Sequence, residues 1–154
     1  MTYPKEIVTI EKITEDAEEV KVSTTVNNEY EEKAVEAANT FMNEFNASSA
    51  DGIAAAINYP HARIGADGKL RIANGPEDMM SAEGFKRFKV GYGWNRSCWD
   101  FREIIFSSPK KVHINVQFSR YRADGSKIGV FPSFWVMTDQ DGHWAIQMRS
   151  SFAP

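Results

Sequence analysis

Two side chains of this sequence have the chemistry of a general acid or base, His61 and Asp100. His61 follows Pro60, where an expected short helix ends and a strand begins, and an imidazole titrates near neutral pH. Asp100 lies beside Trp99 in the string WNRSCWDF, and a carboxyl group among aromatic rings can have a raised pKa. Both residues also have a structural interpretation. His61 could bond a neighbouring backbone carbonyl at the junction, and Asp100 could face solvent or pair with an arginine.

A second set of residues has the chemistry to contact a ligand. Indole rings form flat apolar walls, and an arginine can receive a carboxylate or enolate oxygen. Trp94 is the first choice among the tryptophans because it ends the string GYGW, which predicts a flexible loop. Most tryptophans could instead pack in the core, and Arg149 could form a cross-strand salt bridge. The predicted ligand-binding residues are Tyr59, Arg63, Trp94, Trp99, Trp135 and Arg149.

The sequence has no local signature of a metal or cofactor site. Cys98 is the only cysteine, so the chain can form neither an internal disulfide nor a thiolate metal cluster. The histidines, His61, His113 and His143, lack the i, i+4 spacing of a helical metal site. A phosphate-binding loop and a dinucleotide fingerprint are also missing. We therefore expect neither a metal nor a cofactor.

Composition and charge indicate one folded domain in the cytoplasm. The chain has 154 residues, of which 42% are hydrophobic and 25% charged. Its net charge of −3 argues against nucleic acid or an anionic membrane as the main partner. No stretch approaches the ~20 apolar residues that span a bilayer. The opening string MTYPKEIVTIEKITEDAEE has acidic residues and no apolar run of a secretory signal, which predicts a cytoplasmic location.

The last third of the chain predicts long antiparallel strands that would position these residues. Residues 110–122 alternate apolar and polar side chains, and residues 131–138 and 144–151 follow after the turn strings RADGSK and DQDGH. Asp-Gly turns between alternating runs are typical of a meander. Residues 97–106 predict a fourth strand before them. The alternation places Arg120 on an apolar strand face, where it either extends to the edge or pairs with a buried acid.

The first part of the chain predicts helices and a short hairpin. Asn28, with Glu31 three residues later, matches a capping box, and apolar residues then recur at spacings of three and four as far as Phe45. A short helix, ADGIAAAI, ends before Tyr59-Pro60, and a hairpin and a third helical region follow. Residues 1–27 have strand-like content. We predict an arm or accessory strand over residues 1–27 and a single domain over residues 28–154.

The order of these elements resembles the nuclear transport factor 2-like superfamily, which includes SnoaL-like polyketide cyclases and ketosteroid isomerases. The strings that carry the resemblance are AANTFMNEFNASSADGIAAAINYPH, KVHINVQFSRYRADGSKIG and DGHWAIQMRSSF, and it covers about residues 28–152. It implies an α+β fold in which a cone-shaped, curved antiparallel sheet wraps around about three N-terminal helices. It also implies an apolar cavity between helices and sheet, and a homodimer formed through the sheet.

The superfamily holds enzymes and non-catalytic modules, so the resemblance implies two functions. One is a cofactor-independent isomerase, dehydratase or cyclase that acts on a small apolar molecule through His61 and Asp100. The other is a non-catalytic small-molecule-binding or dimerisation module of the same fold. Ketosteroid isomerases carry a catalytic acid near the first hairpin, where this chain has His61, Arg63 and Asp67. Asp67 belongs to an Asp-Gly turn, so we do not transfer that mechanism.

The two functions predict different geometries. A common cavity for His61 and Asp100 would favour the enzyme, because acid and base must reach the same molecule. Side chains on opposite faces of the sheet would remove the acid–base pair and favour the binding module.

Overall fold

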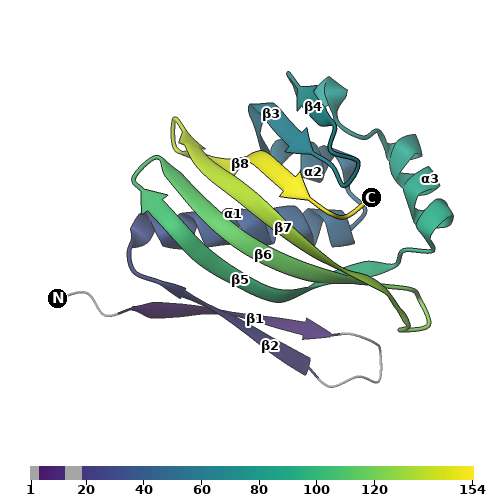
Figure 1. Ribbon diagram of the computed structural model, residues 1–154, viewed down its shortest axis with the longest axis horizontal. Coiled ribbons are helices and arrows are strands. Elements are labelled where there is room, and N and C mark those ends of the chain that lie inside the picture. Colours follow the sequence, from purple (N-terminus) through teal and green to yellow (C-terminus); the bar gives the residue numbers. More distant parts are fainter. Residues whose placement is uncertain (1–3, 13–18) are drawn as a thin grey trace.

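Short strands and helices alternate in the first part of the chain, and the longest strands follow from Arg96 onward (Figure 1). The computed structural model describes residues 4–12 and 19–154. The helices are α1 (Glu29–Asn46), α2 (Ala50–Ala55), the short 3₁₀ helix η1 (Pro76–Asp78) and α3 (Ala82–Tyr92). The strands are β1 (Lys5–Lys12), β2 (Glu19–Val26), β3 (Ile57–Ile64), β4 (Leu70–Ala73), β5 (Arg96–Ser108), β6 (Lys111–Tyr121), β7 (Lys127–Gln140) and β8 (His143–Ser151). No helix within the described ranges is long and apolar enough to cross a membrane.

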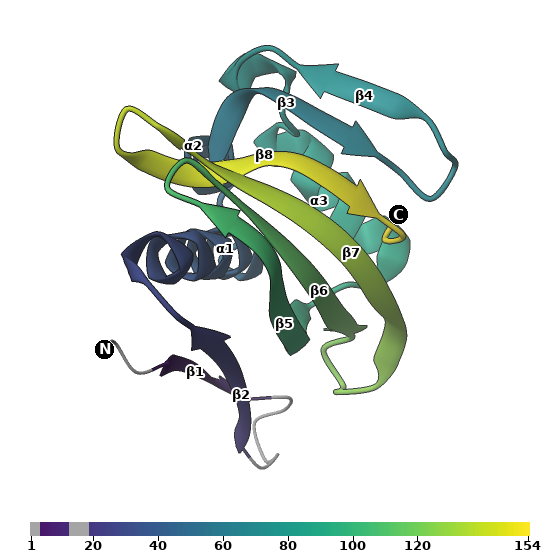
Figure 2. The ribbon, with the colours of Figure 1, turned by 60° about the vertical axis from the view of Figure 1, so that its left-hand side comes forward.

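Six strands form one curved sheet in the order β4-β3-β8-β7-β6-β5. All neighbours are antiparallel except β3 and β8, which run parallel. Figures 1 and 2 show α1 across one face of this sheet, and the separate hairpin β1–β2 beside β5 at the opposite edge from β4. The predicted α+β fold, with a curved and mostly antiparallel sheet around the helices, is confirmed.

Local sequence explains where α1 begins and which face it buries. The Asn28 side chain accepts a hydrogen bond from the Glu31 N–H at 2.9 Å, which satisfies one of the free donors of the first helical turn. Apolar side chains at spacings of three and four then face the sheet. Phe41 is 4% exposed, and its ring centroid lies 5.3 Å from that of Trp135. The concave face of the sheet is thus packed against α1.

The alternation of β6 separates the two faces of the sheet. Val112, Ile114 and Val116 are fully buried on the face toward α1, whereas the side chains between them lie on the outer face. Ile114 is paired with Trp135 of β7, so this indole reaches the same buried face. Each large apolar side chain buried here stabilises the fold by about 1.5–3 kcal/mol. The concave face is therefore the core-forming one.

Two segments differ from the sequence prediction. β3 begins at Ile57 and runs through Tyr59-Pro60, with its pairing to β8 interrupted after Ile57. Pro60 fits this irregular stretch because it has no N–H to donate to a ladder. The prediction of a flexible loop at GYGW is wrong, since α3 extends to Tyr92. It ends at Gly93, whose φ of 62° lies in the left-handed region that terminates many helices.

Buried polar contacts attach the hairpin β1–β2 to the rest of the structure. Arg102 of β5 is 3% exposed and donates hydrogen bonds to Thr9 Oγ1 at 2.9 Å and to Asn39 Oδ1 of α1. Glu11 of β1 lies 3.7 Å from the guanidinium of Arg96, and burial raises the pKa of Glu11. The described residues of the predicted arm thus form a two-stranded hairpin packed along β5.

Candidate functional site

A cavity of about 470 Å³ lies between the concave face of the sheet and the helices. Its wall is largely apolar and includes Phe41 and Phe45 of α1 and Phe88 of α3. A narrower recess of about 30 Å³ shares Phe41 and Phe45 with it and reaches Trp135 and Ser97. The larger volume falls within the range of roughly 300–1,000 Å³ that is usual for small-molecule sites. The fold therefore supplies a pocket of suitable size and character.

Three arginines from three strands line both the cavity and the recess: Arg63 of β3, Arg120 of β6 and Arg149 of β8. We call them the arginine triad. β3 and β8 are parallel neighbours in which Arg63 is the register partner of Arg149, so both side chains leave the same face of the sheet. The triad thus depends on pairing between strands that are far apart in the sequence.

Arg120 is the residue of this site that the sequence prediction missed. It is 6% exposed, and no Asp or Glu side chain in the described part of the chain forms an ion pair with it. Its guanidinium lies 5.0 Å from the ring centre of Phe88 and 5.1 Å from that of Phe131. Such contacts between a cation and aromatic faces offset part of the cost of burial. The signal that could have identified it is its place on the strand face that carries Phe118, which also lines the recess.

Burial and mutual repulsion lower the pKa values of the triad. Burial, followed by repulsion from Arg63 and Arg120, lowers the pKa of Arg149 to about 9. Burial and then Arg63 lower the pKa of Arg120 to about 10, and the pKa of Arg63 is lowered by burial and by Arg71. Arginine stays cationic at neutral pH, so the cavity wall carries positive charge. No Asp or Glu side chain among the described residues forms an ion pair with the triad.

His61 contributes a neutral acceptor to this wall. It is 3% exposed, and its Nε2 accepts a hydrogen bond from Arg149 Nε at 3.3 Å. Burial and then Arg149 lower the pKa of His61 to about 3, against a smaller opposite effect of the backbone at Ile146 and Gln147. A general base works best with a pKa near the operating pH. His61 is therefore suited to holding Arg149 in place rather than to taking a proton at neutral pH.

The structure does not bring Asp100 to this cavity. Its carboxylate accepts hydrogen bonds from Ser119 Oγ at 2.8 Å and from Gln117 Nε2 at 3.3 Å. Ser119 and Gln117 alternate along β6 with the cavity-lining Phe118 and Arg120, so they belong to the outer face. Asp100 and His61 thus lie on opposite faces of the sheet.

The predicted ligand-binding residues fall into two groups. The Tyr59 hydroxyl donates to the Ala54 carbonyl at 2.7 Å, and the Trp94 indole N–H donates to Ser97 Oγ at 2.9 Å. Both contacts are structural, and Trp94 and Trp99 are buried in the core cluster. Of the predicted ligand-binding residues, Arg63, Trp135 and Arg149 line the cavity or its recess. Within residues 4–12 and 19–154, no group of three or more His, Cys, Asp or Glu residues could hold a metal ion.

Solved structures share this fold, although no protein-family model and no curated protein matches the sequence. A protein of unknown function with a cystatin-like fold from Nostoc punctiforme has 16% identity, covers 80% of this chain and 90% of its own, and gives a TM-score of 0.64. An NTF-2-like protein of unknown function from Shewanella oneidensis has 17% identity, with 80% and 98% covered and a TM-score of 0.59. A ketosteroid isomerase-like protein from Erwinia carotovora atroseptica has 15% identity, with 82% and 99% covered and a TM-score of 0.60.

These likenesses identify the fold as that of the nuclear transport factor 2-like superfamily, as the sequence resemblance predicted. At such low identity they show the fold alone. Activity and ligand must be argued from the site, because one fold hosts many functions.

Proposed function

We propose that this protein binds a small, largely apolar molecule in the cavity between α1, α3 and the concave face of the sheet. The observation that carries the proposal is the cavity of about 470 Å³ with its aromatic wall. A ligand that fills it would remove apolar surface from water on both partners, which gains roughly 25 cal/mol per Å². Three phenylalanines from two helices, Phe41, Phe45 and Phe88, would contact the ligand directly.

Binding is preferred over acid–base turnover because the expected catalytic pair is separated. His61 lines the cavity, whereas Asp100 is bonded to Ser119 on the outer face. The low pKa of His61 and its hydrogen bond from Arg149 also leave it poorly suited as a base at neutral pH. The cationic wall can still hold a polar group of the ligand without moving a proton.

Fluorescence titration with the neutral probe N-phenyl-1-naphthylamine tests the proposal. We expect saturable binding of one probe per chain and a higher melting temperature in its presence. Met79→Trp adds bulk to the cavity wall and should abolish binding, whereas the control Val90→Trp, at an 85% exposed position on α3, should not. Circular dichroism would confirm that both variants fold. Absence of binding to the wild type, or undiminished binding to Met79→Trp, would overturn the proposal.

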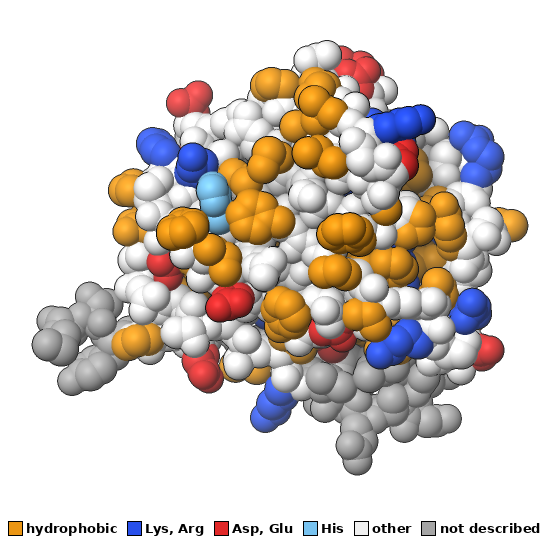
Figure 3. All heavy atoms as spheres, viewed as in Figure 1, with side chains coloured by type: hydrophobic (Ala, Val, Ile, Leu, Met, Phe, Trp, Pro, Cys, Tyr) orange, Lys and Arg blue, Asp and Glu red, His pale blue; other side chains and the backbone are white. Residues whose placement is uncertain are grey.

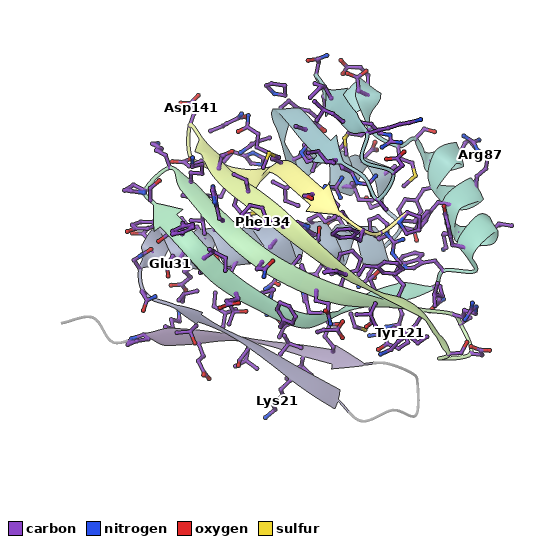
Figure 4. All side chains as sticks on the ribbon, viewed as in Figure 1. Lys21, Glu31, Arg87, Tyr121, Phe134 and Asp141 are labelled. Atoms are coloured by element: carbon purple, nitrogen blue, oxygen red, sulfur yellow. The ribbon has the colours of Figure 1, made fainter. Side chains whose placement is uncertain are left out.

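We also propose that two copies pair through the outer face of the sheet. Figure 3 shows hydrophobic side chains gathered over this face. Phe106, the register partner of His113, is 70% exposed, and Val130, the register partner of Ser119, is 45% exposed. Phe134 lies over the same face in Figure 4, with its ring 5.3 Å from that of His113. Exposed apolar patches of this kind mark association surfaces.

Size-exclusion chromatography with light scattering tests this pairing. Phe106→Glu places a charge in the patch and should convert a dimer into a monomer. Val90→Glu, at an 85% exposed position on α3, is the control that should stay dimeric. A monomeric wild type would exclude the pairing.

A further inference from the structure

We propose that the cavity is a receptor for an organic carboxylate, with the arginine triad holding the anionic group and the aromatic wall holding an apolar body. The inference rests on the proposed function and names the ligand class for the same cavity. Three observations support it: positive charge that no described acidic side chain neutralises, unused hydrogen-bond donors, and oxygen acceptors that already lie against the triad.

No Asp or Glu side chain among the described residues neutralises the positive charge of the triad. Asp67, the acid whose charge acts on Arg63, is bound to Arg71 on the surface at 2.6 Å. Asp78 also lines the cavity, but it accepts the backbone N–H of Asn74 at 2.8 Å and no arginine. Buried cations are costly unless an anion accompanies them. A ligand anion would supply the missing charge.

The triad also has hydrogen-bond donors to spare. Arg120 is more than nine-tenths buried, and its Nε has no hydrogen-bond partner among the described residues. Among the described residues, Arg149 donates a hydrogen bond from Nε to His61. The two terminal nitrogens of Arg149 therefore remain available to a ligand. A guanidinium presents its N–H groups as a planar fork that matches a carboxylate. Because His61 is neutral, it positions Arg149 without adding a further cation.

Oxygen atoms already lie against two members of the triad. Arg63 Nη2 donates to the main-chain oxygen of Ala153 at 2.7 Å, and Arg120 Nη1 donates to that of Pro154 at 3.3 Å. The first acceptor is a backbone carbonyl and the second belongs to the last residue of the sequence, and both contacts orient the guanidinium groups toward oxygen. The surrounding phenylalanines favour an anion that is attached to an apolar body over a fully hydrated one such as inorganic phosphate.

Isothermal titration calorimetry with a matched pair of ligands tests the inference. 1-Naphthylacetate and 1-naphthylacetamide have nearly the same shape, and only the first is charged at neutral pH. Charge-assisted hydrogen bonds predict that the acetate binds roughly tenfold or more tightly than the amide. Arg149→Gln should reduce this ratio to near one through weaker acetate binding, with amide affinity changed by less than about threefold.

Arg122→Gln is the control variant, because Arg122 is exposed in the turn between β6 and β7, donates hydrogen bonds to Ser126 and to the Lys127 carbonyl, and lines neither the cavity nor its recess. It should leave the ratio intact. If Arg149→Gln does not fold, Arg120→Gln serves the same purpose. Equal binding of acetate and amide would overturn the carboxylate inference and leave the binding cavity standing. An equal loss in Arg122→Gln and Arg149→Gln would also overturn it. Failure of both ligands to bind would count against the proposed function itself.

Discussion

Replacing His61 with glutamine should reduce the loss in the free energy of unfolding that the protein undergoes as the pH falls. Burial and the neighbouring Arg149 lower the pKa of His61 from 6.5 to about 3, while Arg63 adds to the effect. The unfolded chain therefore takes up the proton first as the pH falls. The stability that depends on neutral His61 is complete above about pH 6.5 and is lost progressively as the pH falls toward about 3.

The magnitude follows from the distance between the experimental pH and the unfolded pKa. At about pH 5, some 1.5 pH units below the ordinary value, the loss is about 2 kcal/mol at roughly 1.4 kcal/mol per unit. The folded imidazole is almost wholly unprotonated there, so this figure barely depends on how low its pKa lies. A glutamine oxygen can still accept the hydrogen bond from Arg149 Nε, and the substitution thus removes the titration while keeping an acceptor.

Urea unfolding followed by tryptophan fluorescence, at about pH 8 and about pH 5, measures the effect. Between the two pH values the wild type should lose about 2 kcal/mol more than His61→Gln. His113→Gln is the matched control, since His113 is partly exposed on the outer face and should leave most of the loss in place. Equal losses in the wild type and His61→Gln would refute the argument that the cavity holds His61 neutral.

Three further substitutions test other parts of the structure. Arg149→Met removes a buried cation and its repulsion from Arg63 and Arg120, so it should raise the free energy of unfolding without ligand by about 1 kcal/mol. A lower free energy of unfolding in a urea titration would contradict this. Trp135→Ala removes a side chain that is 1% exposed and should cost about 3–5 kcal/mol in the same assay, with a cost below about 2 kcal/mol counting against its place in the core. Arg102→Met leaves Thr9 without its donor, so limited proteolysis should cut the hairpin β1–β2 faster than in the control Arg122→Met.

Elements with strong local patterns could be predicted from the sequence. The cap at Asn28 and the alternation of β6 depend on neighbouring residues alone, and the structure confirms both. GYGW was misread because its glycines indicate a loop, whereas packing decides its structure. Trp94 is 3% exposed and lies 5.2 Å from the ring centre of Phe45, a contact across 49 residues that the local string does not reveal.

The site was harder to predict because it depends on which sheet face is concave. The alternation of β6 shows which residues share a face, but it does not place Asp100 on either face. Its hydrogen bond from Ser119 shows that it lies on the outer face. Arg63 and Arg149 meet because β3 and β8 pair in parallel, although 85 residues separate the two arginines in the sequence. Arg120 was expected to reach an edge or an acid, and instead aromatic rings surround it.

A structural role and a binding role of the arginine triad predict different effects of removing one arginine on stability and on ligand affinity. A set of arginines kept only to hold the fold would lie beside carboxylates, and its loss would destabilise the protein. Here Asp67 and Asp78 are bound elsewhere, and burial, followed by repulsion from Arg63 and Arg120, lowers the pKa of Arg149. Removal of one cation should therefore stabilise the empty protein and weaken carboxylate binding at the same time. A purely structural triad would lose stability in that variant and leave the ratio of acetate to amide affinity unchanged.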